Sequence, residues 1–140
     1  MEDKSLEIID LELALLIRRI TSANRKIGHL DRSAYLILYR ILSDGPAGVK
    51  TLAEESDLDI STLSRQTAAL EQKGFVERMP DPLDRRAYSL QITELGKQEF
   101  FEHRKLRFAA LAENFKSWSE EEQRQFASLL QKYNHPFKKK

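Results

Sequence analysis

Apolar residues recur at steps of three and four along most of this chain, which is the pattern of amphipathic helices. The first predicted helix covers residues 6–27. Its apolar stripe consists of Leu6, Ile9, Leu13, Leu16, Ile17 and Ile20. Gly28 ends this helix, and Asp31 is the expected N-cap of a second helix, which stops at residues 44–46. Both helices are therefore strongly apolar on one face.

Two shorter helices follow, joined by a tight turn. The first covers residues 50–55 and the second runs from about Ile60 to Lys73. Asp59 or Ser61 can cap the second helix, and Gly74 can end it because glycine enters the left-handed conformation cheaply. The residues expected to face inward are Leu52, Ala53, Leu63 and Leu70. The pair has the form of a helix-turn-helix.

The hydrophobic period then changes from that of a helix to that of a strand. Residues 75–79 and 87–92 are short alternating runs with strand-like composition. Residues 80–86, between them, have the proline and aspartate chemistry of a turn. We predict a β-hairpin with a polar tip.

Two more helices are predicted after the hairpin. Thr93 is the expected N-cap of a helix that reaches about Trp118 and is apolar on several sides, and Ser119 with Glu122 forms a capping box for a last helix. A small winged lobe does not need three further amphipathic helices to fold. We therefore expect the helices of residues 6–27 and 93–135 to form a homodimer; the alternative is that they complete a monomeric core.

Composition narrows the classes of protein. The formal net charge is only +1, so the chain lacks the overall basicity that is common in nucleic-acid-binding proteins. It has no cysteine, which excludes disulfides, cysteine-ligated zinc and a cysteine redox switch within the chain. No apolar run approaches the roughly 20 residues of a membrane helix. The N-terminus carries acids where a signal peptide carries positive charge, and we expect a cytoplasmic protein with no membrane partner.

The start of the helix over residues 60–73 has the chemistry of DNA recognition. Hydroxyl groups can approach phosphates and base edges, arginine can pair with guanine and glutamine with adenine. The helix N-terminus adds backbone N–H groups that favour phosphate. The candidate DNA-binding residues are Lys50, at the start of the preceding short helix, and Ser61, Thr62, Ser64, Arg65 and Gln66 of this helix. The alternative is a capped, polar surface helix.

The hairpin tip carries two adjacent arginines, Arg85 and Arg86. An arginine that enters a minor groove is attracted by the negative potential concentrated there. Asp81 and Asp84 can orient the guanidinium groups through charge-assisted hydrogen bonds. The alternative for this segment is an exposed, ion-paired loop without a ligand.

Together these segments resemble the MarR family of bacterial transcriptional regulators. The segments that carry the resemblance are Leu52-Ala53-Glu54, residues 61–65, residues 70–78, Asp81-Pro82-Leu83-Asp84-Arg85-Arg86 and residues 90–96. The wing motif followed by Leu90-Gln91-Ile92-Thr93 and Gly96 is the most specific part. The resemblance covers residues 30–115 by motif and the whole chain by the order and length of its helices.

The resemblance implies a mainly α fold with a small β-hairpin wing. It implies one chain, residues 1–140, in which residues 30–92 form the winged helix-turn-helix lobe and the first and last two helices form the dimer. The recognition helix would enter the major groove and the wing the adjacent minor groove of double-stranded DNA. Arg86 would be the wing-tip arginine, Asp84 its orienting partner and Arg85 a phosphate contact.

Many members of the family repress transcription and release DNA when a small aromatic or lipophilic ligand binds. The resemblance implies such an effector pocket near the junction of helices one, two and five, and its candidate lining is His29, Tyr35 and Tyr39, which core packing explains equally well. Asp57 stands where the family commonly has glycine in the turn. The three histidines, at 29, 103 and 135, are far apart in sequence, so we expect no metal site.

The leading hypothesis is a ligand-responsive repressor that binds a pseudo-palindromic operator as a homodimer. The alternative is a winged-helix module that uses the same surface to bind a protein, because fold does not fix function. The sequence contains no phosphate-binding loop, nucleophile elbow or zinc-protease motif, so we expect no enzyme activity and no cofactor.

Overall fold

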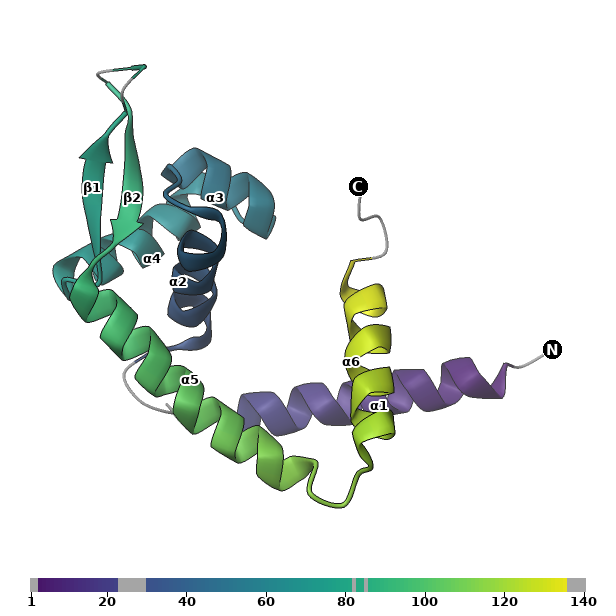
Figure 1. Cartoon of the computed structure of the whole chain (residues 1–140). Coiled ribbons are helices and arrows are strands. Elements are labelled where there is room, and N and C mark those ends of the chain that lie inside the picture. Colours follow the sequence, from purple (N-terminus) through teal and green to yellow (C-terminus); the bar gives the residue numbers. More distant parts are fainter. Residues whose placement is uncertain (1–2, 23–29, 82, 85, 136–140) are drawn as a thin grey trace.

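The structure is a computed structural model, and it describes residues 3–22, 30–81, 83–84 and 86–135. This part of the chain forms six helices and one antiparallel hairpin, which projects from the helices (Figure 1). The elements are α1 (Lys4–Ser22), α2 (Arg32–Asp44), α3 (Val49–Ser56), α4 (Ile60–Gln72), β1 (Val76–Pro80), β2 (Tyr88–Ile92), α5 (Glu94–Asn114) and α6 (Glu120–Asn134). The predicted order of elements is confirmed. Residues 23–27 of the predicted first helix lie outside the described residues.

The helix starts follow from their capping side chains. The Asp31 carboxylate accepts a hydrogen bond from the Ala34 N–H at 2.8 Å, and the Thr93 hydroxyl accepts one from the Gly96 N–H at 3.0 Å. Ser119 and Glu122 form the predicted reciprocal capping box at α6. Each cap satisfies backbone donors that have no partner within the helix.

The end of α5 was predicted too late. The helix stops at Asn114 rather than near Trp118. Aromatic packing explains the early stop: Phe115 and Trp118 meet edge to face with ring centroids 4.7 Å apart, and both contact Phe126 of α6. The turn between α5 and α6 is thus closed by side-chain contacts that only the folded chain brings together.

Gly74 ends α4 and aims the chain into the hairpin, as predicted. It adopts φ +81°, and its N–H donates to the Glu71 carbonyl at 3.0 Å. The next N–H, of Phe75, donates to the Leu70 carbonyl at 2.9 Å. These two bonds form a Schellman motif, which satisfies the last carbonyls of the helix.

The hairpin pairs Val76 with Ile92 at one end and Pro80 with Tyr88 at the other. The loop before α3 adds a further pair that the sequence did not predict. Ala47 exchanges both backbone hydrogen bonds with Leu90, at 2.8 and 3.4 Å. This pairing ties the start of the helix-turn-helix to the wing.

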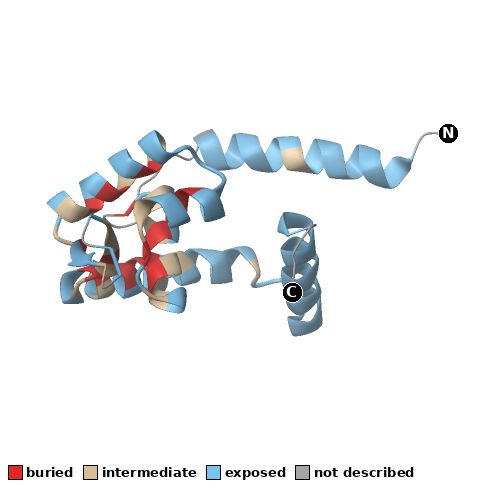
Figure 2. Cartoon of the chain, turned by 90° about the horizontal axis from the view of Figure 1, so that it is seen from above, coloured by how far each residue is buried: buried red, intermediate tan, exposed pale blue. Residues whose placement is uncertain are grey.

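The core lies entirely within the lobe formed by α2, α3, α4, the hairpin and the first half of α5 (Figure 2). Leu38, Leu63 and Leu90 have no exposed surface, and Phe100 has 1%. The predicted inward residues Leu52, Ala53, Leu63 and Leu70 are all buried. By contrast, α1 extends away from the lobe and α6 stands apart from it, and both are drawn almost wholly exposed.

The turn between α3 and α4 places Asp57 in the left-handed region, with φ 55° and ψ 37°. A Cβ atom is disfavoured in this conformation, although aspartate tolerates it better than most residues. We expect Asp57→Gly to raise the free energy of unfolding by about 0.5–1 kcal/mol. Urea denaturation checks this, with Asp57→Ala as the control that should destabilise. A Gly variant less stable than the wild type would contradict the argument.

Candidate nucleic-acid interface

One side of α4 is exposed along its whole length. Ser61, Ser64 and Arg65 lie on it, as predicted, whereas Thr62 is half-buried. The same stripe continues through Ala68 and Gln72, which the sequence reasoning missed. The signal was available, because both residues follow Ser61 and Ser64 at helical spacing. Small side chains along this face would let the helix axis approach a surface closely.

Gln66 lies on a different side of α4. It is half-buried, and its Nε2 donates a hydrogen bond to the Ser33 hydroxyl of α2 at 3.2 Å. The side chain thus makes a contact within the lobe and is turned away from the exposed stripe. We therefore do not carry Gln66 into the proposed set of base-reading residues.

The N-terminus of α4 is occupied by its own cap. One Asp59 carboxylate oxygen accepts from the Thr62 N–H at 2.7 Å and from the Ser61 hydroxyl at 3.0 Å. Hydrogen bonds from the Thr62 side chain, the Thr62 N–H and the Ser61 hydroxyl lower the pKa of Asp59 from its ordinary value. A phosphate at this helix end would meet a carboxylate, so the expected binding of phosphate by backbone N–H groups is opposed here. Contacts from α4 must come from its side chains.

The wing tip is organised by its two aspartates. Asp84 accepts from the Arg86 N–H at 3.0 Å and lies 3.8 Å from the Arg86 guanidinium, while the Arg86 side chain is 95% exposed. Asp81 instead accepts from the Leu83 N–H at 2.8 Å and so holds the turn backbone. Arg85 lies outside the described residues. The geometry therefore agrees with Asp84 as the partner of Arg86.

Arg78 links α4 to the hairpin, a role that the sequence reasoning missed. Its Nε lies 3.0 Å from a Glu71 carboxylate oxygen, and its guanidinium stacks over the Tyr88 ring at 4.2 Å. The three residues come from α4, β1 and β2, so only the folded chain brings them together. These contacts hold α4 and the wing in a fixed orientation relative to each other.

Lys50 is exposed in the first turn of α3. Nearby, α2 and α3 are joined by Arg40, whose Nε and Nη2 donate to the two carboxylate oxygens of Glu55. Its Nη1 also donates to the Gly45 carbonyl at 3.0 Å. The bidentate pair lowers the pKa of Glu55 and holds the end of α3 against α2.

Two of the three predicted effector residues lie in one aromatic cluster. Tyr35 stacks on Phe100 with centroids 4.9 Å apart and tilts against the buried His103 at 5.1 Å. Tyr39 is half-exposed and lies 6.2 Å from Phe100. The Arg107 guanidinium lies 4.8 Å above the Tyr35 ring. The third predicted residue, His29, lies outside the described residues.

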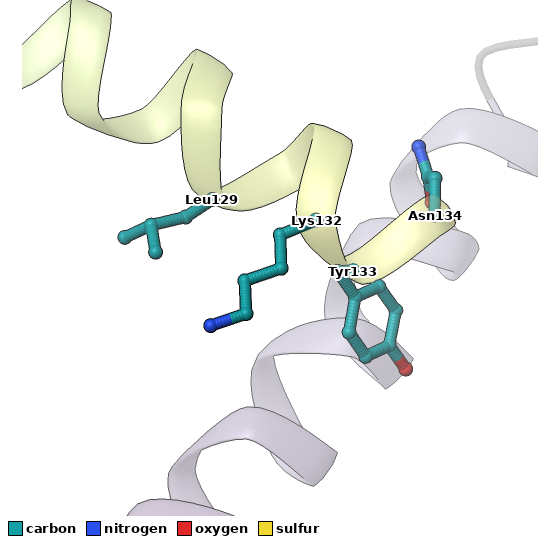
Figure 3. A pocket seen from close by; sticks show the side chains of 4 residues that line it. All are labelled: Leu129, Lys132, Tyr133 and Asn134. Atoms are coloured by element: carbon teal, nitrogen blue, oxygen red, sulfur yellow. The ribbon is translucent and has the colours of Figure 1, made fainter. Parts of the chain in front are cut away.

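Two hollows of the surface lie elsewhere. One is open, and its lining among the described residues comes from α6, through Leu129, Lys132, Tyr133 and Asn134 (Figure 3). The other lies between α2, β2 and α5 and is lined by Ile41, Leu42, Pro46, Gln91, Ile92 and Lys97. Neither includes Tyr35 or Tyr39. The aromatic cluster is packed against itself in this structure.

Apolar side chains cover α1 and α6 outside the lobe. Five residues of the predicted α1 stripe are exposed, from 63% at Leu6 to 36% at Leu16, and the sixth, Leu13, is half-buried. A second apolar stripe, which the sequence analysis did not predict, consists of Ile8, Leu11 and Leu15. On α6 the exposed apolar residues are Phe126, Leu129, Leu130 and Tyr133. A surface this apolar is typical of a protein interface.

Two classes of site find no support in the described part of the chain. Its histidines and acids form no group of three or more that could hold a metal ion. No described helix has the length and apolar character needed to cross a membrane. His103 is buried within the lobe and His135 is exposed after α6.

Comparison with known proteins agrees with this geometry. The family model described as MarR family matches residues 30–88. The chain is 43% identical over 134 residues to YxaD, an uncharacterized HTH-type transcriptional regulator of Bacillus subtilis, and the match covers 94% of each chain. A MarR family protein from Bacillus stearothermophilus has the same fold, with a TM-score of 0.81, 22% identity and 99% of each chain covered. The regulator PcaV from Streptomyces coelicolor, solved with its natural ligand, has a TM-score of 0.69 at 20% identity, with 85% of this chain and 89% of PcaV covered.

Proposed function

The chain belongs to the MarR family of transcriptional regulators, and on this premise we propose that it is a homodimeric, ligand-responsive repressor of a pseudo-palindromic DNA operator. The observation that carries the proposal is the pairing of an exposed recognition stripe on α4 with a wing that presents Arg86 to solvent. We also propose that the protein acts in the cytoplasm, where bacterial transcription takes place. Its DNA-facing cations are few, so fit to the duplex must supply much of the affinity.

Each element has a part in the proposed DNA complex. The α4 stripe enters the major groove, where Ser61, Ser64 and Arg65 reach phosphates and base edges. Arg86 enters the neighbouring minor groove, with Asp84 limiting the freedom that its guanidinium loses on binding. Lys50 contacts the phosphate backbone. Thr62 is half-buried, so it offers less contact area to DNA than the exposed residues of α4 do. Arg85 is proposed as a phosphate contact from the family motif alone.

The exposed apolar surface of α1 and α6 supports a homodimer. Neither helix contributes a residue to the buried core of the lobe. Both nevertheless carry many exposed large apolar side chains. Two apolar stripes on α1 fit a helix that packs against more than one neighbour. A two-fold dimer would place two α4 helices about 34 Å apart, which matches successive major grooves on one side of a duplex.

The proposed effector site is the aromatic cluster around Tyr35 and Tyr39. Flat rings at the junction of α2 and α5 offer stacking surfaces, and Arg107 supplies a cation beside them. This chemistry suits a small aromatic or lipophilic ligand. A ligand that separates the stacked rings would shift α5 relative to α2, and so change the spacing of the two lobes.

Replacing Arg86 tests the DNA-binding proposal. We expect Arg86→Ala to lower affinity for a duplex selected by the wild-type protein by about 5- to 150-fold. Fluorescence anisotropy between 50 and 200 mM salt measures this, and wild-type binding should weaken steeply with salt because phosphate contacts release counterions.

Lys116→Ala is the matched control, since it removes the same charge from an exposed lysine beyond α5. It should bind DNA within about twofold of the wild type, as expected for a surface charge distant from the interface. Equal losses of DNA affinity in both variants would mean that Arg86 acts only through the net charge of the protein and makes no specific contact. If the affinity of the wild type does not change with salt concentration, a protein partner for this surface is favoured instead.

A further inference from the structure

The wing tip carries an apolar side chain that the folded lobe does not use. Leu83 is 95% exposed, the highest value among the large apolar residues of the described chain. Turn positions are ordinarily filled by polar residues or by glycine and proline. The exposed methyl groups add no packing to the lobe and are therefore available for contact with a bound partner.

The backbone around Leu83 is held in place before any partner arrives. Its N–H donates to the Asp81 carboxylate at 2.8 Å. The loop is closed on both sides of Leu83, because the Asp81 N–H donates to the Ala87 carbonyl at 3.2 Å and the Ala87 N–H to the Asp84 carbonyl at 3.1 Å. These bonds tie the described residues on both sides of Leu83 to the loop before a partner binds.

Leu83 shares this loop with the fully exposed Arg86. Charge attraction at the tip is limited, because the loop sequence contains as many aspartates as arginines. Apolar contact is therefore expected to contribute a larger fraction of the DNA affinity here than in a wing whose tip carries only cations. A side chain of this kind fits the walls of the minor groove, where proteins place apolar residues against sugars and between base steps.

We infer that Leu83 is an apolar wedge that packs into the minor groove beside Arg86 and makes affinity depend on how easily the DNA deforms there. The inference rests on the proposed function, since it assumes that the wing meets a duplex. Pyrimidine–purine steps unstack most easily, so they are the preferred sequence beneath the wing. Leu83 is then a specificity-determining residue that reads shape, while α4 reads base edges.

The test uses the full-length protein and a duplex selected by the wild type, with the wing position located by hydroxyl-radical footprinting. Leu83→Ala should weaken binding about 5- to 20-fold, as expected for loss of most of one buried leucine contact. The slope of log affinity against log salt should stay unchanged, because no phosphate contact is lost. Leu83→Met, which keeps an apolar side chain of similar volume, should bind within about threefold of the wild type.

A second pair of duplexes tests the sequence dependence. They differ only beneath the wing, where one carries a TA step and the other an AA step. The wild type should prefer the TA duplex, and Leu83→Ala should lose most of that preference. Equal preference in both proteins would overturn the inference, as would Leu83→Ala binding within twofold of the wild type.

Arg86→Ala separates this inference from the proposed function. If the wild type binds no duplex with steep salt dependence, the proposed function fails. If Arg86→Ala binds weakly and Leu83→Ala does not, only the wedge fails. The variant that combines Leu83→Ala with Arg86→Ala is compared with Leu83→Ala alone. It should have a lower slope of log affinity against log salt, because Arg86 still contacts DNA when only Leu83 is replaced. Equal slopes would mean that Leu83→Ala already removes the Arg86 contact by disturbing the loop, and the wedge would be refuted.

Discussion

Gly96→Ala is expected to lower the free energy of unfolding by about 3 kcal/mol or more, at the upper end of the cost of overpacking. A Cβ at this buried position would overlap the backbone carbonyl oxygen of Phe75 and lie 2.8 Å from Ile92 Cγ1. That carbonyl accepts the Thr93 N–H at 3.0 Å, so it cannot retreat without breaking the junction between the hairpin and α5. The added Cβ would meet the Phe75 backbone, and backbone atoms can move aside far less than the end of a flexible side chain can.

Helix propensity argues for the opposite result, which makes the test sharp. Gly96 lies in the first turn of α5, and alanine in a helix is ordinarily more stable than glycine by about 1 kcal/mol. Chemical denaturation followed by circular dichroism, at one fixed protein concentration, measures the difference. A variant as stable as the wild type would show that the hairpin and α5 are not packed this closely.

Gly45→Ala provides the comparison. Gly45 adopts φ +93°, but nothing lies within 4 Å of a Cβ built there. Its substitution adds conformational strain alone, of about 1–3 kcal/mol, because this extended positive-φ region is essentially restricted to glycine. The larger loss in Gly96→Ala would then report the close approach of α5 to the chain at Phe75.

Local signals in the sequence were sufficient for much of the fold. Asp31, Thr93 and Ser119 each cap a helix through the backbone N–H three residues ahead, so the necessary information lies within one turn. Gly74 ends α4 for a similarly local reason. The wing motif predicted its own turn, because Asp81 and Asp84 bond to amides within the same loop.

Other features depend on contacts between distant residues. Gln66 faces inward because Ser33, in another helix, accepts its hydrogen bond. The Ala47–Leu90 pairing occupies a single residue between a proline and a glycine, too short to show any period. Arg78 contacts Glu71 of α4 and Tyr88 of β2, and neither partner can be read from the sequence around it. In each case the local pattern allowed several orientations, and tertiary packing selected one.

Leu130→Glu is expected to convert the proposed dimer into monomers. Leu130 is 41% exposed on α6, and α6 has no buried residue, so the substitution should leave the lobe folded. In a two-fold interface the change brings in two unpaired carboxylates, each costing several kcal/mol when buried. The dissociation constant of the dimer should rise by about 1,000-fold or more, the equivalent of about 4 kcal/mol.

Loss of the dimer should remove most of the DNA affinity as well, because a monomer holds only one half-site. Analytical ultracentrifugation gives the oligomeric state, and anisotropy on the same selected duplex gives the affinity. Gln131→Glu is the matched control, since it adds the same charge at an adjacent, exposed polar position of α6. It should remain dimeric and bind DNA like the wild type. A Leu130→Glu protein that sediments as a dimer would place the interface elsewhere than on this face of α6.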